Sequence, residues 1–462
     1  MATPFVLGID SSTQSCKAVL VNAETGEVVD QRRTPHPEGT QVDPVRWLEA
    51  MNEATSGLLD RAAAVSVAGQ QHGMVALDAA GEPVREAMLW NDTSSAPQAR
   101  DLVTELGGSE RCAAAVGSVM VASLTASKLR WMRDMEPENA ARTEYVMLPH
   151  DYLTWHLGGR SEMTTDHGDA SGTGYYSTSE RAFLPGLAAR ALGREVALPR
   201  LAGPNEIVGM TPGGAKIAAG TGDNMAAALG LDLGPGDVCV SIGTSGVASA
   251  VVAQSVHDGR GLVTGFLDAT GRSLPLACTL NGAPVLDFGA RMLGVDHQEF
   301  TRLALGAEEG AGGAVLLPYL GGERTPNRPN ASGLMHGLRA STSREQFARA
   351  IVEGLLCSMK DAVSALENAT GVVTDRILLI GGGAQSEAVR RIAPEIFGLS
   401  VDVPATAEYV ALGAARQAAW ALGGAAEPPP WKAVESRRYK ATHRPEIYGR
   451  YATVRDATVG WT

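Results

Sequence analysis

Two aspartates of this chain follow short apolar runs that predict buried β-strands. Asp10 ends the run VLGI and begins the hydroxyl-rich turn DSSTQS, and Asp223 follows the apolar residues IAA and the turn GTG. A carboxylate at the end of a buried strand is costly unless a cation meets it. Mg²⁺ takes oxygen ligands and is usually held by carboxylates together with substrate phosphates. The turn after Asp10 therefore predicts a phosphate and Mg²⁺ site, with an ordinary hairpin and Asx-type turn as the alternative.

A second strand–turn–strand unit occurs more than 200 residues later. The segment VCVSIGTSGVASAVV, at positions 238–252, repeats the order of apolar strand, small polar turn and apolar strand. Two such units predict two similar halves of the chain. Because ligand sites favour domain interfaces, a nucleotide is expected between these halves, with its phosphates touched by both turns.

Asp223 has two interpretations from its position alone. It can cap the following helix, since Asp is a favoured N-cap residue. It can also be a catalytic base that orients a hydroxyl and accepts its proton late in phosphoryl transfer. The positive end of the helix dipole is expected to keep this carboxylate ionised, with a low pKa that suffices for such a base.

Three other polar segments follow predicted strands or turns. GQQHG, at 69–73, places His72 where it can bond a hydroxyl, and the alternative is a satisfied loop histidine. GGGAQS, at 381–386, lets a flat ligand or phosphate approach the backbone before a helix, although any tight strand–helix turn can use three glycines. TTDHGDASGTG, at 164–174, contains Asp166, His167 and Asp169, but their spacing matches no metal motif and predicts a turn-rich loop.

The bulk composition limits the class of protein. A length of 462 residues fits two or three domains, and 44% hydrophobic with 19% charged residues is ordinary for a globular chain. The net charge of −12 argues against a broad basic surface for nucleic acid. Without an 18-residue apolar run or a signal peptide, a soluble cytoplasmic protein is expected. The five scattered cysteines are expected to be reduced core thiols.

Alternating predicted strands and helices indicate an α/β fold. Strands are predicted at 6–9, 18–21, from 28, 65–68, 74–77, 87–90, 312–320 and 376–380. Helices are predicted from Asp43-Pro44, at 96–106, 124–135, 151–157 and 225–229, after Ser343, and at 387–397 and 408–422. Residues 321–333 are expected to form a rigid, non-helical loop. The three prolines at 428–430 are expected to lead into a polar tail that lies as a strap on the surface.

In this order the segments resemble the FGGY carbohydrate kinases, within the actin/hexokinase-like ATPase superfamily, from residue 7 to about residue 419. GIDSSTQS is similar to the family's first phosphate segment, SIGTSG to its second, and GGGAQS to its adenosine segment. SKLRWM, at 127–132, is similar to its first signature. GQQHG, DASGTGYY, GDN and GERTP together resemble the xylulose kinase branch of that family.

The resemblance implies two actin/hexokinase-like (ribonuclease H-like) ATPase domains with a catalytic cleft between them. Residues 1–234 would hold the sugar site, the first phosphate segment and the catalytic base. Residues 235–435 would hold the second phosphate segment and the adenosine segment, and 436–462 would be a C-terminal tail. The implied reaction is ATP-dependent phosphorylation of D-xylulose at O5, a step of xylose catabolism, with Mg²⁺. The implied partners are sugar and ATP, without nucleic acid or membrane. The resemblance is also compatible with a homodimer.

The resemblance also implies roles for individual residues. Asp223 would be the catalytic base, and Asp10 would be catalytic through the Mg²⁺ that it serves. The sugar would be held by Gln71, His72, Asp223 and Asn224. The nucleotide phosphates would lie near Ser12, Thr13, Gly243 and Thr244, and the adenosine against Gly382, Gly383 and Ala384. Gln71 departs from the branch, which often has Met there, and a side-chain contact at this position would shift the sugar preference.

Rival functions remain open at this point. The same fold could phosphorylate ribulose, an alditol or glycerol, and a few cleft side chains would decide. A different class is a non-catalytic sugar or nucleotide sensor, or an actin-like assembly protein. Intact Asp10 and Asp223 argue against a sensor, and the GQQHG segment argues against a filament protein. Fold analogy alone does not choose among them.

Overall fold

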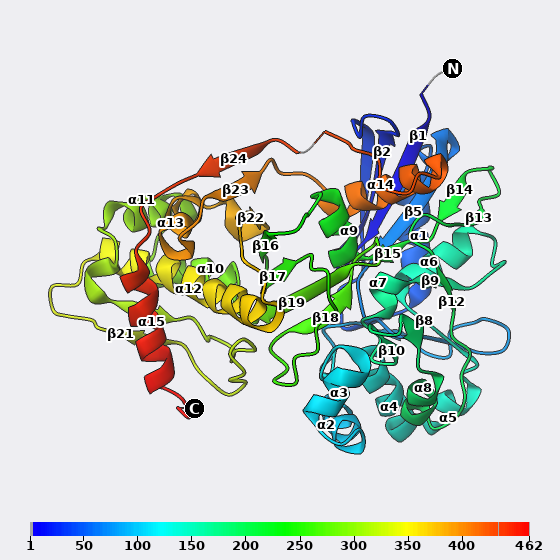
Figure 1. Cartoon of the computed structure of the whole chain (residues 1–462), viewed down its shortest axis with the longest axis horizontal. Coiled ribbons are helices and arrows are strands. Elements are labelled where there is room, and N and C mark those ends of the chain that lie inside the picture. Colours follow the sequence, from blue (N-terminus) through cyan, green and yellow to red (C-terminus); the bar gives the residue numbers. More distant parts are fainter. Residues whose placement is uncertain (1–2, 433, 462) are drawn as a thin grey trace. The chain divides into compact units, whose positions relative to one another are not determined.

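The computed structural model describes residues 3–432 and 434–461 (Figure 1). The chain divides into two compact units. The first consists of Met1–Asp232, Ala253–Leu274 and Ala407–Ala433, and the second of Leu233–Val252, Pro275–Thr406 and Val434–Thr462. Each unit is therefore built from segments that are distant in the sequence.

A seven-stranded mixed sheet forms the centre of the first unit. Its strand order is β13-β14-β5-β1-β2-β3, and β15 also pairs with β5. The strands are β1 (Phe5–Ser11), β2 (Ser15–Asn22), β3 (Val28–Pro35), β5 (Ala62–Gly69), β13 (Ile207–Met210), β14 (Lys216–Ala218) and β15 (Thr221–Gly222). β1 pairs antiparallel with β2 and parallel with β5, so the predicted first hairpin is confirmed and becomes the middle of the sheet.

Helices cover both faces of this sheet because alternate residues of β1 point to opposite sides. Leu7 and Ile9 pack in a core with α1 (Pro44–Thr55) and α6 (Pro149–Leu157), whereas Val6 packs against α14 (Tyr409–Gly423). Asp43 caps α1 by accepting a hydrogen bond from the Val45 amide, as its position before a proline predicts. In Figure 1, α14 is the orange helix beside the blue strands β1 and β2.

The rest of the first unit is mostly helical. A separate core lies among α2 (Ala96–Glu105), α3 (Ser109–Val116), α4 (Thr125–Met135), α5 (Pro137–Arg142) and α8 (Pro185–Leu192). Short paired strands are β4 (Gln41–Val42), β6 (Val75–Leu77), β7 (Ala87–Met88), β8 (Tyr145–Met147), β9 (Thr164–Asp166), β10 (Tyr176–Ser177), β11 (Ala182–Phe183) and β12 (Arg200–Ala202). The remaining elements are α7 (His167–Ala170), α9 (Asp223–Gly230) and β18 (Thr264–Leu267).

The second unit is built on a sheet with the order β19-β17-β16-β22-β23-β24. These strands are β16 (Asp237–Ile242), β17 (Gly246–Ala250), β19 (Ser273–Thr279), β22 (Arg376–Ile380), β23 (Val401–Pro404) and β24 (Ser436–Tyr439). Its helices are α10 (Pro284–Leu293), α11 (His297–Gly306), α12 (Arg344–Thr370), α13 (Glu387–Phe397) and α15 (Pro445–Ala457), and a small hairpin joins β20 (Val315–Leu317) to β21 (Leu334–His336). Ser343 caps α12 with a capping box that includes Gln346, which confirms the predicted start of that helix.

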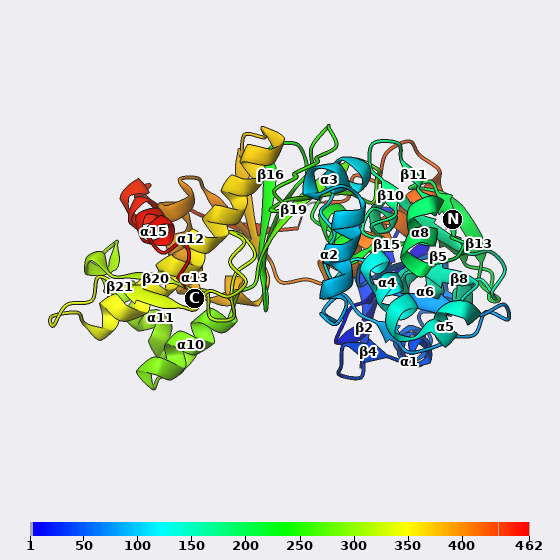
Figure 2. The ribbon, with the colours of Figure 1, turned by 90° about the horizontal axis from the view of Figure 1, so that it is seen from below.

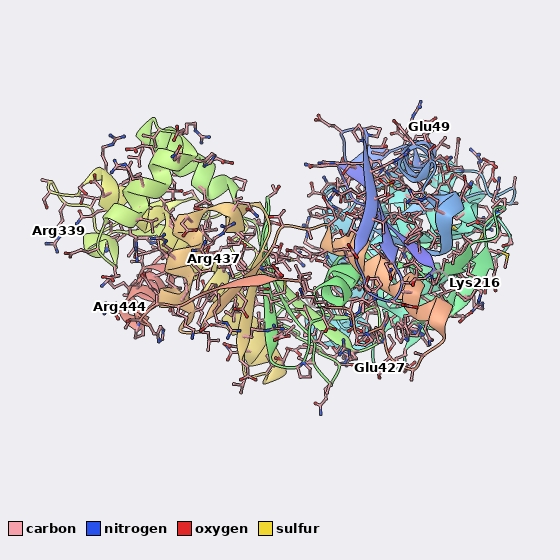
Figure 3. All side chains as sticks on the ribbon, turned by 90° about the horizontal axis from the view of Figure 1, so that it is seen from above. Glu49, Lys216, Arg339, Glu427, Arg437 and Arg444 are labelled. Carbon is pink, nitrogen blue, oxygen red and sulfur yellow. The ribbon has the colours of Figure 1, made fainter. Side chains whose placement is uncertain are left out.

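The C-terminal tail differs from the expected surface strap. β24 pairs with β23, and α15 packs against α12, as Figure 2 shows for the red and yellow helices. Ile447, Tyr451 and Val454 are buried at spacings of one helical face, a pattern that the sequence already contains. Figure 3 labels two of the polar residues of this tail, Arg437 on β24 and Arg444 directly before α15.

Two smaller expectations are also corrected. The segment at 164–174 was expected to be a loop, yet it contains β9 and α7, because the Asp166 side chain accepts hydrogen bonds from the amides of Gly168 and Asp169 and starts a helical turn. The strand predicted at 87–90 is reduced to β7. In the part of the chain that the structure covers, no helix is both long enough and apolar enough to cross a membrane.

Candidate active site

Three neighbouring parallel strands of the first unit end at the same level, and the predicted polar residues follow them. Across β1, β5 and β15, Asp10 is in register with Ala68, and Ala68 is in register with Thr221. The GQQHG segment follows β5, and Asp223 follows β15. Open α/β sheets bind ligands at the carboxyl ends of their strands. The register thus brings Asp10, Gln71, His72, Asp223 and Asn224 to one edge of one sheet.

Asp10 is a buried carboxylate that is only partly compensated. The residue is 2% exposed, and its Oδ2 lies 3.4 Å from the Nζ of Lys17, which also lies 2.7 Å from the Glu408 Oε2. Burial raises the pKa of Asp10 to about 6 although Lys17 opposes the shift. The other oxygen, Oδ1, is buried and has no hydrogen-bond partner within the described chain.

The free oxygen of Asp10 fits a divalent cation. Mg²⁺ is commonly bound by one or two carboxylates while phosphates and water complete its ligands. Nowhere among residues 3–432 and 434–461 do three or more His, Cys, Asp or Glu side chains gather as a metal cage. A cation held mainly by Asp10 and a substrate is the arrangement that these residues allow.

The hydroxyl groups after Asp10 shape the turn itself. Ser12 donates to the carbonyl of Ser15 at 2.9 Å. Thr13 donates to the Gln70 side chain at 3.3 Å and accepts from the Trp90 indole at 2.9 Å. Gln70 and Trp90 were not predicted as site residues, although Gln70 lies within the GQQHG segment. These contacts tie the predicted phosphate turn to the segment that follows β5.

Gln71 and His72 are held by side chains from other elements. The Asn224 amide donates to the Gln71 Oε1 at 2.8 Å, and the Gln71 side chain is buried. His72 has a φ of +68°, and its Nδ1 lies 2.8 Å from the Gly172 carbonyl oxygen. The His72 ring also packs against Phe266 at a centroid distance of 5.3 Å. Positive φ is uncommon outside glycine, so the surrounding contacts hold His72 in a defined place.

Asp223 begins α9 but does not cap it. Gly222 occupies the cap position, and the Oδ1 of Asp223 accepts hydrogen bonds from the backbone and side-chain nitrogens of Asn224, at 2.8 and 3.1 Å. The expected low pKa is wrong, because burial raises the pKa of Asp223 to about 7 and the charges of Asp10 and Asp169 add to the shift. The positive potential at the start of the eight-residue helix α9 is too small to outweigh these effects.

A fully buried polar cluster lies beneath this edge of the sheet. The His150 Nδ1 lies 2.6 Å from the Asp169 Oδ2, and its Nε2 lies 3.2 Å from the Asp151 Oδ1. Burial opposes the imidazolium, but the carboxylates outweigh it and raise the pKa of His150 to about 9. A Cβ built on Gly222 would lie 3.1 Å from the Asp169 Oδ1, so this carboxylate adjoins the turn directly before Asp223. The sequence pointed to Asp169 only as a loop residue.

The second unit brings two other predicted turns to one edge of its own sheet. β16 and β22 are parallel with Ser241 opposite Ile380, so the turns after them, at 243–245 and 381–385, leave the same edge. Gly381 and Gly383 are required by the fold, because a Cβ at either would lie within 2.6 Å of an Ile242 atom. Gly382 is exposed, with no atom within 4 Å of such a Cβ. Open backbone at Gly382 is suited to a flat ligand, whereas Ala384 is buried.

The first unit thus has buried carboxylates beside polar groups suited to a sugar, and each unit has small polar turns at its strand ends. This combination is typical of a phosphotransferase of the two-unit α/β ATPase class. The model of the FGGY family of carbohydrate kinases, N-terminal domain, matches residues 5–230, and that of the C-terminal domain matches residues 238–422. The chain belongs to this family. It is a carbohydrate kinase, and its substrates are a sugar and ATP.

Several relatives bear a more specific name. The xylulose kinase of Streptomyces coelicolor is 46% identical over 91% of this chain and 89% of its own length. That of Streptomyces rubiginosus is 43% identical over 96% and 92%. The solved xylulose kinase of Bifidobacterium adolescentis has a TM-score of 0.92 and 43% identity, covering 98% of this chain and all of that one. A gluconate kinase from Lactobacillus acidophilus reaches a TM-score of 0.91 at 23% identity, which shows the shared fold alone.

Proposed function

We propose that this protein transfers the γ-phosphate of ATP to O5 of D-xylulose, giving D-xylulose 5-phosphate and ADP. The choice of sugar is supported by relatives named xylulose kinase that are 43% and 46% identical over nearly the whole chain. The chemistry is supported by one observation above all. The register of β1, β5 and β15 gathers Asp10, His72 and Asp223 at a single sheet edge.

In the proposed reaction Asp223 accepts the proton of the sugar hydroxyl. Both hydrogen bonds from Asn224 end on Oδ1, so the carboxylate is oriented and Oδ2 is left for the substrate. Gln71 and His72 bind other sugar hydroxyls. Because phosphoryl transfer passes through a loose transition state, holding the hydroxyl in line contributes more than strong basicity does.

The phosphates are assigned to turns in both units. Ser12 and Thr13 lie on the turn of the first unit, and Gly243 and Thr244 on that of the second. Gly382, Gly383 and Ala384 would lie against the adenosine. Mg²⁺, when bound, would neutralise phosphate charge, and Asp10 is the residue proposed to hold it. The base and sugar site are thus assigned to the N-terminal part, up to about residue 234, and the nucleotide contacts mainly to 235–435.

The test is direct measurement of ADP released from Mg²⁺-ATP with D-xylulose, ribulose, an alditol, glycerol and no sugar. We expect strong stimulation by D-xylulose alone, and loss of that stimulation in Asp223→Asn with nucleotide binding retained. Gly186→Ala, a substitution with no atom within 4 Å of the new Cβ, is the matched control. ATP binding without stimulation by any sugar would replace this proposal with a sensor or filament function.

A kinase for another ketose is the second candidate, and Gln71 is the observation in its favour. Its side chain, and not only its backbone, is engaged with Asn224, and its Nε2 is buried without a hydrogen-bond partner within the described residues. A buried amide donor rejects substrates that lack a matching oxygen. If this candidate is correct, Gln71→Met raises kcat/KM for D-xylulose relative to the other ketoses, whereas an unchanged ratio removes Gln71 from the determinants of preference.

Other parts of the hypothesis stay predictions. A homodimer is one, and light scattering of the purified protein tests it. A cytoplasmic location, without nucleic-acid or membrane partners, is another, and cell fractionation tests it.

A further inference from the structure

The turn at Gly243 and Thr244 is held from one side by the chain that follows β19. The Ala283 amide donates to the Gly243 carbonyl at 2.7 Å, and the Gly282 amide donates to the Thr244 carbonyl at 3.2 Å. Gly282 permits this approach, because a Cβ there would lie 2.3 Å from the Gly243 oxygen. Two consecutive peptides of the turn are therefore fixed by backbone contacts alone.

These contacts determine where the turn points its donors. In a planar trans peptide the N–H points opposite to the C=O. With the carbonyls of Gly243 and Thr244 directed at residues 282–283, the amides of Thr244 and Ser245 are directed to the other side. Successive N–H groups that converge in this way form an anion-binding concavity. The segment at 280–283 thus holds the turn in the orientation that directs the Thr244 and Ser245 amides to the other side.

A buried glutamate holds that support in place. Glu323 lies in the GGERTP loop and is 1% exposed. Its Oε1 accepts from the amides of Leu280 and Arg324, at 2.6 and 2.7 Å, and its Oε2 accepts from the Asn281 side chain at 2.9 Å. One carboxylate therefore joins its own loop to the residues directly before Gly282.

Asn281 completes the connection. Its Nδ2 also donates to the Gly322 carbonyl at 2.8 Å, and its Oδ1 accepts from the Leu320 amide at 3.1 Å. Both amide hydrogens and the oxygen of this side chain are thus hydrogen-bonded to residues within 320–323. Such a fully bonded, buried network is rigid, and replacing one member leaves others unsatisfied.

We propose that Glu323 is a positioning residue for the nucleotide phosphates, acting through Asn281 and residues 280–283 on the Gly243–Thr244 turn. This inference rests on the proposed phosphate role of that turn. Glu323 itself does not contact the nucleotide. It stabilises the arrangement in which the Thr244 and Ser245 amides face the phosphates. The GERTP segment thereby supports the phosphate turn through its buried glutamate.

The test is isothermal titration calorimetry, which measures the affinity of the full-length protein for Mg²⁺-ADP and for adenosine, which lacks phosphates. In Glu323→Gln the new amide presents a donor to the Asn281 donor, so the network cannot close. We expect ADP affinity to fall on the order of tenfold while adenosine affinity stays within about twofold. In kinetics, KM for ATP rises on a similar scale and KM for the sugar does not.

The matched control is Glu353→Gln, the same substitution at a buried glutamate of the same unit. Glu353 is 4% exposed and binds Arg349 and the Gly310 amide, not the phosphate turn. Glu353→Gln should lower the melting temperature without changing the ratio of ADP affinity to adenosine affinity. Equal effects of the two variants on ADP would mean that Glu323 acts only on general stability, and would overturn the inference.

A double-mutant cycle tests the coupling between Glu323 and Asn281 separately from any general loss of stability. If Glu323 acts through Asn281, the variant with both Glu323→Gln and Asn281→Ala binds ADP no more weakly than the worse single variant. Additive losses would refute the connection. If the wild-type protein binds ADP no more tightly than adenosine, the phosphate role of the turn is itself refuted. This result differs from failure of the Glu323 inference, so the two hypotheses can be tested separately.

Discussion

The pH dependence of sugar phosphorylation tests the assignment of Asp223 most sharply. The base must be ionised to accept a proton, and burial with the nearby carboxylates raises its pKa to about 7. The ionised fraction is then about one half at pH 7, about a tenth at pH 6 and about a hundredth at pH 5. Accordingly kcat/KM for the sugar should fall about tenfold per pH unit below the pKa.

The sequence alone leads to a different expectation. A helix-start aspartate with a low pKa would be ionised throughout this range, and the profile would be flat from pH 8 down to about pH 5. The assay is ADP release in stopped aliquots with limiting Mg²⁺-ATP and limiting sugar, so that the rate reports the protein without bound Mg²⁺, the state to which this pKa applies. Because the phosphates of ATP also titrate near pH 6, the profile of Asp223→Asn, which lacks the base, is subtracted as the background. A flat profile over this range contradicts the structural reasoning.

Asp223→Asn provides the second half of this test. The amide oxygen can keep the hydrogen bonds from Asn224, so the main loss is the proton acceptor, which is worth about 10²–10⁴ in rate, or roughly 3–5 kcal/mol. The acid limb should vanish from the residual activity. The pKa of Asp223 is higher in the folded protein than in the unfolded chain, so its ionisation destabilises the folded state above the unfolded pKa, and most strongly above pH 7. Because asparagine carries no such charge, this variant should also be more stable than wild type at pH 8. Retained wild-type turnover would refute the base assignment.

Three further substitutions probe the surrounding structure. Gly172→Ala places a Cβ 2.4 Å from the His72 Nδ1, so the ring should shift and the KM for the sugar should rise on the order of tenfold in steady-state kinetics. Asp10→Asn removes the negative charge and one of the two carboxylate oxygens, and titration of activity with Mg²⁺ should show half-saturation at a concentration more than about tenfold higher. Gly8→Ala drives a Cβ to 1.9 Å from the Ala411 carbonyl oxygen, and urea unfolding should show a loss of about 3 kcal/mol or more.

Gly186→Ala is the control for both glycine variants, because the new methyl group meets no atom within 4 Å and lies in a helix. It should leave activity unchanged and slightly raise stability. If Gly172→Ala leaves the sugar KM unchanged, the His72 contact does not position the substrate. If Asp10→Asn leaves the Mg²⁺ requirement unchanged, the cation is held elsewhere.

Much of the site was accessible from sequence because its parts are local. Asp10 and Asp223 each lie at a strand end that apolar runs and turn residues mark within a few positions, and the structure places both there. The cap of α12 at Ser343 and the start of α13 after the GGGAQS turn were predicted for the same reason. Capping and turn chemistry depend on neighbours three or four residues away, so they can be recognised without the fold.

The tail and the 164–174 segment show where this reasoning fails. Polar composition suggested a surface strap after the prolines, but three apolar residues at helical spacing bury α15 against α12. A polar composition is typical both of a loop and of the exposed face of an amphipathic helix, so it does not distinguish them. At 164–174 the side chain of Asp166 satisfies the first amides of α7, a hydrogen-bonding choice that a turn-rich sequence leaves open.

The sequence by itself determined the two strand–turn–strand units, the family and the residue types available for the reaction, since these follow from short-range patterns. Only the tertiary structure decided which of those residues meet. The pairing of β1, β5 and β15, which are far apart in the chain, sets Asp10 and Asp223 near one another and brings Asp169 under the loop before Asp223. Burial and mutual repulsion then reverse the pKa that the helix start alone predicts, because electrostatic energies depend on distance and solvent exposure, which no local pattern encodes.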